Sequence, residues 1–242
     1  MLSAPFSWEH EHVAAALPGA RALFTTRRGG VSGGPYASLN LGRLTADSDA
    51  NVDENRARVA AATGCPRDAF LNGRQVHGAR VRRATEPPGP ARPHVEEDGQ
   101  ATALAAHPAL VFVADCLPVL LVAPGAVAAV HAGWRGLAAG ILHEGVQALR
   151  DLGGSGPVTA LIGPGARGCC YEVGEEVHAA FAAYDARRGE RNLDLAAVVA
   201  AQLEDHALHD TGLCTMCHPH LFFSHRASGG VTGRQAGVVW RV

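Results

Sequence analysis

Short apolar runs with the length of β-strands dominate the centre of the chain. Three follow one another closely, at 109–113, 117–123 and 126–130, and a fourth lies at 158–163. Apolar runs of four to eight residues bounded by turn signals are typical of buried strands. Pro124-Gly125 separates the second run from the third and is a turn signal. The pattern predicts a hairpin among buried strands.

Helical periodicity appears between and beyond these runs. Residues 51–63 are predicted to form a helix that stops at Gly64, and 137–152 carry apolar side chains at three- and four-residue steps. Further helices are expected at 173–184 and 193–208, and further strands at 76–81, 221–226 and 236–242. Because strands and helices mix without a strict βαβ rhythm, the predicted fold class is α+β.

A proline-rich stretch interrupts this pattern at 86–93. Four prolines in eight residues exclude a helix or a central strand, so the stretch is expected to be a surface loop or a boundary between subregions. The chain has 242 residues, which suits one domain or two tightly fused halves.

The amino-acid composition and net charge exclude several classes of protein and of mechanism. Hydrophobic residues make up 47% and charged residues 18% of the chain, which excludes a disordered protein. The net charge of −2 gives no basic field for nucleic acid, so no nucleic-acid partner is expected. All 21 basic residues are arginine, which removes Schiff-base and P-loop lysine mechanisms. The 13 histidines are a surplus of metal ligands and acid–base groups.

The sequence gives no sign of export or membrane insertion. The N-terminal residues lack the basic and apolar regions of a signal peptide, and no apolar run approaches the length of a membrane span. Six cysteines are too few for a disulfide scaffold. We therefore expect a cytoplasmic protein without a membrane partner, in which cysteines are thiols or metal ligands.

The predicted hairpin brings a cysteine and a histidine together. If Pro124-Gly125 is its centre, opposed positions sum to 249, so Pro118 faces His131. Cys116 shares a face with Pro118 and is then a diagonal neighbour of His131, roughly 7–8 Å away at the backbone. This separation allows both side chains to reach one ion, with Zn–S about 2.3 Å and Zn–N about 2.0 Å.

A third ligand is available from His77, in the segment Gln75–Gly78. With Cys116 and His131 it would form a His₂Cys site with a vacant fourth position, the pattern of a catalytic zinc site. Zinc there would lower the pKa of a bound water to about 7. The spacing matches no short zinc motif, and a buried thiol with two core histidines is the alternative interpretation.

The segment Cys214-Thr-Met-Cys217-His218 is a rival candidate for metal or redox chemistry. It matches the c-type haem attachment motif, which normally requires export. It also resembles half a zinc ribbon, but there is no second CxxC. A redox pair, a small site completed by His218 and His220, and a chance pair of loop thiols stay open. The adjacent Cys169-Cys170 is expected to include a core thiol.

Two arginines are candidates for binding an anion. Arg135, near the predicted helix start after His131, and Arg226, near the C-terminus, could bind phosphate bidentately. The alternatives are an exposed helix-start arginine and a surface salt bridge. The glycine loop Gly163–Gly168 follows a strand, but its proline breaks a dinucleotide fingerprint, so we interpret it as a tight turn.

Taken together, several motifs resemble one family. They are FTTRRGGVSGGPYASLNLG (24–42), RQVHG (74–78), ADCLPVLL (114–121), VHAGWRG (130–136), IGPG with CYEVG (162–174), and CTMCHPHLFFSHR with TGRQAGVVW (214–240). In this order they resemble the YfiH/DUF152 family, also called laccase-domain or polyphenol oxidase proteins. The resemblance covers nearly the whole chain and identifies it as a member.

The resemblance implies a single YfiH-like domain over 1–242, a four-layer α/β/β/α sandwich with mixed sheets. It implies a zinc site at His77, Cys116 and His131, with copper as the other metal attributed to the family. Two departures concern substrate contacts. Ala227 stands where many members have arginine, and 98–102 vary a segment that often contains Asp-Ala-Leu.

The resemblance also implies a zinc-dependent purine nucleoside enzyme. Its expected reactions are phosphorolysis of inosine, guanosine, adenosine and methylthioadenosine to free base and sugar phosphate, and deamination of adenosine. The partners are then purine nucleosides and phosphate, with Arg135 and Arg226 near phosphate and Asn40 as a sugar or base contact. The alternatives are a copper polyphenol oxidase, a metal-free Cys–His hydrolase such as one that edits peptidoglycan precursors, and a non-catalytic binding protein.

Overall fold

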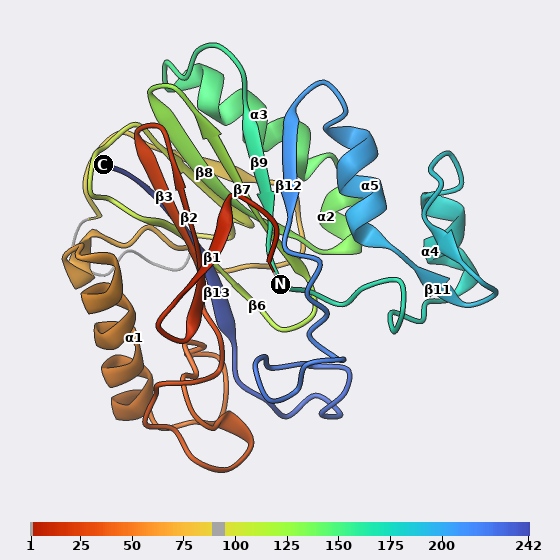
Figure 1. Cartoon of the computed structure of the whole chain (residues 1–242), viewed down its shortest axis with the longest axis horizontal. Helices are drawn as coiled ribbons and strands as arrows, with labels where there is room; N and C mark the ends of the chain where they lie inside the picture. Colours follow the sequence, from red (N-terminus) through yellow and green to blue (C-terminus); the bar gives the residue numbers. More distant parts are fainter. Residues whose placement is uncertain (1, 89–94) are drawn as a thin grey trace.

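Two β-sheets form the centre of the molecule, and helices lie on their outer sides (Figure 1). The computed structural model describes residues 2–88 and 95–242. The predicted loop at 86–93 therefore lies mostly outside the described residues. Within the described part, no helix has both the length and the apolar character needed to cross a membrane.

The first sheet is five-stranded and antiparallel, in the order β1-β2-β3-β13-β6. Its strands are β1 (Phe6–Glu9), β2 (His12–Leu17), β3 (Ala20–Phe24), β6 (Ala109–Val113) and β13 (Gln235–Arg241). The two runs predicted at 109–113 and 236–242 are thus confirmed as strands, and they pair with each other although they are far apart in the chain.

The second sheet is six-stranded and mixed, in the order β12-β9-β7-β8-β5-β4. Its strands are β4 (Val81–Ala84), β5 (Gly99–Thr102), β7 (Leu117–Ala123), β8 (Ala126–Ala132), β9 (Thr159–Ile162) and β12 (Ala207–Asp210). The predicted hairpin is confirmed with its register, since Pro118 pairs with His131 and Ala123 with Ala126. Both central strands are buried along their whole length.

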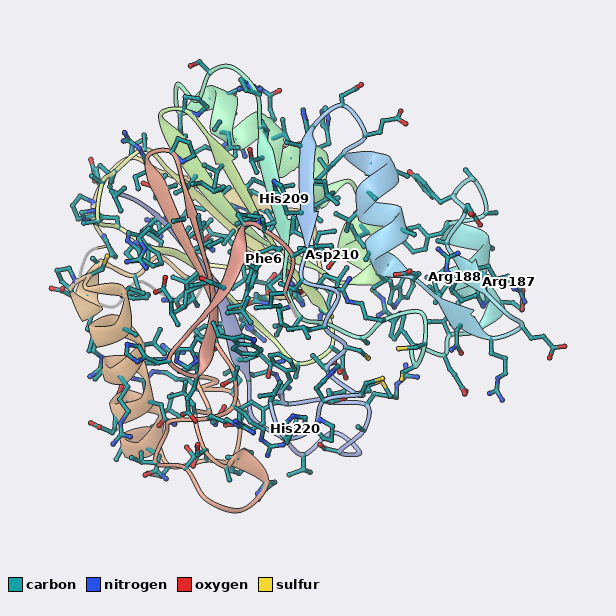
Figure 2. The ribbon with its side chains drawn as sticks, in the orientation of Figure 1. Phe6, Arg187, Arg188, His209, Asp210 and His220 are labelled. Atoms are coloured by element: carbon teal, nitrogen blue, oxygen red, sulfur yellow. The ribbon has the colours of Figure 1, made fainter. Side chains whose placement is uncertain are left out.

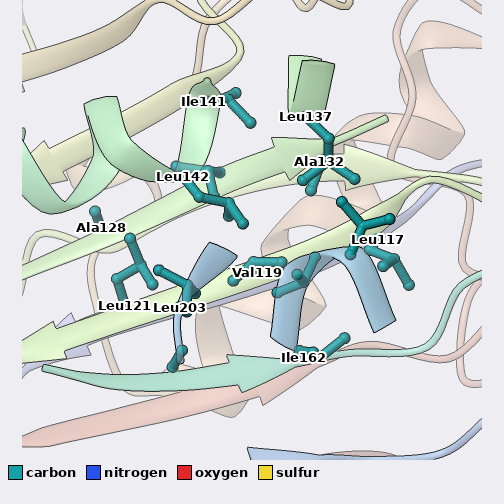
Figure 3. Packing of buried hydrophobic residues seen from close by; sticks show 14 of the residues in the cluster. Leu117, Val119, Leu121, Ala128, Ala132, Leu137, Ile141, Leu142, Ile162 and Leu203 are labelled. Atoms are coloured by element: carbon teal, nitrogen blue, oxygen red, sulfur yellow. The ribbon is translucent and has the colours of Figure 1, made fainter. Parts of the chain in front are cut away.

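Helices cover the outer faces of both sheets. The helices are α1 (Asp49–Thr63), α2 (Trp134–Ala138), α3 (Ile141–Asp151), α4 (Glu175–Ala180) and α5 (Leu195–Gln202). In Figure 1, α4 lies beyond α5, away from the two large sheets. Short 3-10 turns lie at Gly34–Tyr36 and Arg67–Ala69, and β10 (Arg187–Arg188) and β11 (Asn192–Leu193) form a small two-stranded sheet. Val59 of α1 packs against Leu23 and Trp240 of the first sheet. Helices α2, α3 and α5 pack against the second sheet (Figure 3).

Alternate residues of β7 enter two different hydrophobic cores. Val119 and Leu121 face the helices, where they pack with Leu142 (Figure 3). Leu120 and Val122 face the first sheet and pack with Phe24 and other residues of that sheet. Successive side chains of a strand point to opposite faces, so β7, which has a hydrophobic core on each face, needs apolar residues along its whole length. The resulting order of layers is helix, sheet, sheet, helix.

Several predicted elements differ from the structure. The helix expected at 137–152 is broken at Gly140, which has φ +87° and starts α3 anew. The helices expected at 173–184 and 193–208 are shorter, and the end of the second range enters β12 instead. The segment 221–226 is not a strand: Phe223 N–H donates to the side chain of Gln235, so it is tied to β13 without joining a sheet.

The position of Leu120 between the sheets generates a stability prediction. Its side chain is fully buried, so Leu120→Ala should lower the free energy of unfolding by about 2–5 kcal/mol through lost burial and a residual cavity. Leu44→Ala is the matched control, because Leu44 is 82% exposed and its change should stay within about 0.5 kcal/mol. Denaturant unfolding measures both variants, and equal stability would contradict the two-sheet core.

Candidate active site

The β7–β8 hairpin delivers two of the predicted site residues. Cys116 lies directly before β7, and His131 lies near the end of β8, where it pairs with Pro118, two residues after Cys116. His131 is 3% exposed, whereas Cys116 is only half-buried. Both residues sit at the open end of the hairpin, where the strands give way to loops.

The third residue, His77, comes from a loop and not from the strand expected at 76–81. That expectation is wrong, since the strand begins only at Val81 and His77 has the positive φ of +62°. The ring centroids of His77 and His131 lie 4.8 Å apart in an edge-on arrangement. The ligand atoms of His77, Cys116 and His131 all lie within 4.8 Å of one another.

Asp98, for which no role was predicted from the sequence, fixes the conformation of this loop. Its carboxylate accepts hydrogen bonds from three successive backbone N–H groups, those of Val76 at 3.0 Å, His77 at 2.9 Å and Gly78 at 2.8 Å. These bonds replace the strand partner that 76–78 lack. Asp98 is 1% exposed and lies directly before β5, so a buried residue adjoining the sheet holds the loop of His77.

The same carboxylate fixes the ring of His131. Nδ1 of His131 lies 2.7 Å from Oδ1 of Asp98, so this nitrogen carries a proton toward the carboxylate. The other ring nitrogen, Nε2, is then free of a proton in the neutral ring. A carboxylate that holds one nitrogen of a histidine is the usual companion of a metal-binding imidazole.

Cys116 and His131 influence each other's ionisation. Burial opposes charge on both, but the positive charge of His131 and its hydrogen bond lower the pKa of Cys116 below its ordinary value. In turn, the thiolate of Cys116 and the bond to Asp98 raise the pKa of His131. Both shifts favour a thiolate beside an imidazolium over two neutral side chains.

The backbone around the three side chains is closely fitted. A Cβ atom on Gly133 would lie 3.1 Å from Sγ of Cys116 and 3.2 Å from Cδ2 of His77, so glycine keeps the space between them open. Asp115 has φ +100°, a conformation that costs about 1–3 kcal/mol for a residue other than glycine. Its carboxylate accepts bonds from Thr215 Oγ1 at 2.7 Å and Arg226 N–H at 2.8 Å, which hold it there.

The two arginines selected from the sequence lie close enough to Tyr171, which was not selected, for their charges to act on its phenol, as the charge of Cys116 also does. Arg226 is exposed, donates to the carbonyl of Glu172 at 2.8 Å and approaches the ring of Tyr171 to 5.6 Å. Arg135 is exposed and stacks over Trp134 at 4.2 Å. Burial and the charge of nearby Cys116 raise the pKa of Tyr171 to about 12, so its phenol stays protonated.

Asn40 differs from the arginines because its amide is already occupied. The side chain is fully buried, donates to Thr45 and Asp47, and accepts from the N–H groups of Gly42 and Arg234. Arg234 is a further residue that was not predicted from the sequence. Burial lowers its pKa, and the negative charges of Asp115 and Cys116 only partly oppose this shift. Asn40 thus holds a loop and an arginine near the site.

The ionised pair generates a pH prediction that does not require a metal. In chelator-treated protein, Cys116 should react with iodoacetamide at a rate that rises with pH and levels off well below the pKa of about 8.5 of a free cysteine, because its thiolate forms early. Cys65 is the internal comparison, since burial raises its pKa. Peptide mass spectrometry follows both sites. A midpoint for Cys116 at or above 8.5 would contradict the pairing with His131.

Comparison with known proteins gives consistent results over nearly the whole chain. A family model described as "Multi-copper polyphenol oxidoreductase laccase" matches residues 21–242. A purine nucleoside phosphorylase of Deinococcus radiodurans is 40% identical over 226 residues, which cover 89% of this chain and 87% of that protein.

Two proteins named YfiH are also similar to this chain. Purine nucleoside phosphorylase YfiH of Shigella flexneri is 37% identical, covering 93% of this chain and 95% of the relative. The crystal structure of the Bacillus licheniformis hypothetical protein YfiH matches with a TM-score of 0.89 at 28% identity, covering 99% of this chain and all of that one. The chain therefore belongs to the laccase-like YfiH family.

Proposed function

We propose that this protein is a zinc-dependent purine nucleoside phosphorylase whose centre is His77, Cys116 and His131. The observation that carries the proposal is the convergence of these three ligand atoms within 4.8 Å, with Asp98 holding His131. The names of the relatives in Deinococcus radiodurans and Shigella flexneri supply the reaction class.

The donor set fits a zinc ion. Two imidazole nitrogens and one thiolate are typical zinc ligands, and three protein ligands are typical of a catalytic zinc site. The lowered pKa of Cys116 favours the thiolate that binds metal. Asp98 orients Nε2 of His131 by holding Nδ1. Zinc held there supplies Lewis-acid chemistry that polarises a bound substrate.

Phosphorolysis joins a phosphate oxygen to C1′ of the ribose while the bond from C1′ to the purine nitrogen breaks. The electron pair of that bond goes to the purine, which takes up a proton and leaves as the free base. We assign phosphate binding to Arg226 and Arg135, because a guanidinium matches phosphate oxygens and their positive charges lie around Tyr171. The protonated phenol of Tyr171 offers a hydrogen-bond donor in the same place.

The substrates that we infer are inosine, guanosine, adenosine and methylthioadenosine. Deamination of adenosine, in which water replaces the amino group at C6 and ammonia leaves, is assigned to the same three residues. We assign Asn40 a positioning role through Arg234, since its amide is committed to the loop.

Copper oxidase chemistry is a second candidate because of the description of the family model. A multicopper oxidase requires several coppers, with histidine prominent among their ligands. In the described part of the chain, two clusters could hold a metal, and only that of His77, Cys116 and His131 contains histidine. This donor set favours a single histidine-bound ion, and therefore the nucleoside enzyme.

The proposed activity is tested by incubating the protein with inosine, with and without phosphate. We expect hypoxanthine and ribose-1-phosphate only when phosphate is present. Cys116→Ala should lose the metal of this site and the activity together, whereas Cys65→Ala, in a different hydrophobic core, should keep both. Chromatography of the products and metal analysis provide the readouts. Full phosphorolysis by Cys116→Ala would exclude this centre, and oxygen-dependent turnover of phenols without phosphorolysis would favour the oxidase.

Asp98→Asn tests the positioning of the histidine. The amide keeps the shape of the side chain but loses the negative charge and one acceptor, so metal affinity should fall by about 10–100-fold. Competition with a chromogenic chelator measures that affinity without reference to turnover. Asp151→Asn is the control, because Asp151, at the end of α3, is exposed and pairs with Arg83 of β4 instead of with a site residue. Unchanged affinity in Asp98→Asn would remove Asp98 from this role.

A further inference from the structure

Four cysteines outside the candidate active site gather in one place. Cys169 and Cys170 lie on the loop after β9, and Cys214 and Cys217 lie on the loop after β12. Their four sulfur atoms lie within 4.8 Å of one another. Figure 2 shows sulfur atoms, in yellow, close together between the labels of Asp210 and His220. The expectation that the adjacent pair includes a core thiol is wrong: Cys169 is exposed and Cys170 is half-buried.

The sulfur separations match those of four ligands around one ion. Sγ of Cys217 lies 3.3 Å from Sγ of Cys170 and 3.6 Å from Sγ of Cys169. In tetrahedral zinc with Zn–S bonds of about 2.3 Å, neighbouring sulfurs are about 3.8 Å apart. A disulfide requires about 2.05 Å, so all four thiols are free here. Four soft sulfur donors select zinc over harder cations such as magnesium.

The two loops are joined independently of the cysteines. Gly165 N–H donates to Leu213 O at 3.2 Å, and Thr215 N–H donates to Gly165 O at 3.0 Å. Arg167 forms a bidentate ion pair with Asp210, at 2.7 and 2.8 Å. Asp210 is labelled at the end of β12 in Figure 2. The four sulfurs are therefore brought together by the fold and need little rearrangement to bind an ion.

We propose that Cys169, Cys170, Cys214 and Cys217 form a second zinc site, of the closed, structural kind. The sequence shows only half of this site as a CxxC, and the fold supplies the other half. On binding, the thiols release their protons to solvent and each thiolate donates an electron pair to the ion, with no change of oxidation state. The proposal is independent of the proposed enzymatic function, because it rests on different residues.

The second site would act on the first through the loop that follows β12. Thr215, between Cys214 and Cys217, donates to Asp115, and so does the backbone of Arg226 further along the same segment. Asp115 directly precedes Cys116 and carries the unfavourable φ of +100°. An ion that joins the two loops would thus hold the backbone from which Cys116 extends.

Metal analysis of protein purified anaerobically with a thiol reductant tests the proposal. We expect two zinc ions per chain in the wild type, one in Cys217→Ser and one in Cys116→Ala. Cys65→Ser is the matched control and should retain two, because Cys65 lies in another core. One zinc per wild-type chain that disappears in Cys116→Ala would overturn the second site. A Cys170–Cys217 disulfide in this anaerobic preparation would also overturn it.

Cobalt substitution gives a second readout that does not depend on whether Cys217→Ser folds. In the Cys116→Ala chain, Co²⁺ should bind at one equivalent and show the intense thiolate-to-cobalt absorption of a tetrahedral four-sulfur site. Absence of that absorption in a folded Cys116→Ala chain would contradict four-sulfur binding. Failure of the nucleoside assay, by contrast, would leave this spectrum unchanged, so the two proposals are tested separately.

Discussion

One buried carboxylate, that of Asp98, organises the candidate active site. It accepts three backbone N–H bonds from the loop of His77 and holds the ring of His131 at 2.7 Å. Burial alone would raise the pKa of Asp98, but the bonds from His131 and from the backbone lower it, so it is ionised in the fold. A single negative charge in the core thereby sets the position of one histidine and the orientation of another.

The two-sheet architecture explains why this charge can be buried. Asp98 lies at the start of β5, which pairs with β8, and His131 N–H on that strand donates to Asp98 O at 2.7 Å. The helix-covered sheet fixes both strands, so the histidine and its carboxylate approach from neighbouring strands of a rigid layer. Cys116 lies directly before β7, the strand that pairs with β8 on the side opposite to β5. The third side chain of the site, that of His77, comes from a loop.

Local pattern was sufficient to predict part of the site. The register of the hairpin follows from the turn at Pro124-Gly125 and the apolar runs on either side, which is why Cys116 and His131 could be paired from the sequence. The alternation of side chains along a strand does not show which residues from distant parts of the chain will contact it. The role of Asp98 depends on residues about twenty positions earlier and thirty positions later, so nothing near it in the sequence identifies it. His77 could be named as a third ligand from its segment Gln75–Gly78, but its loop conformation could not be predicted, since the segment was expected to be a strand.

Helices and strands with a local sequence signal were predicted correctly, whereas those that depend on contacts with distant residues were not. The helix ending at Gly64 and the central strands carry their own signals, whereas the break at Gly140 depends on a positive φ that the apolar stripe conceals. β1 to β3 have mixed patterns and were not predicted, because they depend on pairing with one another and, through β3, with the distant β13. The cysteine cluster was hidden for a similar reason, since its halves are more than forty residues apart.

Anomalous diffraction at the zinc edge, on crystals of the metal-loaded protein, tests the central claim most directly. The account predicts a peak about 2.0 Å from a ring nitrogen of His77 and from Nε2 of His131, and about 2.3 Å from Sγ of Cys116, with Nδ1 of His131 still bonded to Asp98. A fully loaded crystal with no peak between these three residues, or with His131 bound through Nδ1 and turned away from Asp98, would contradict it.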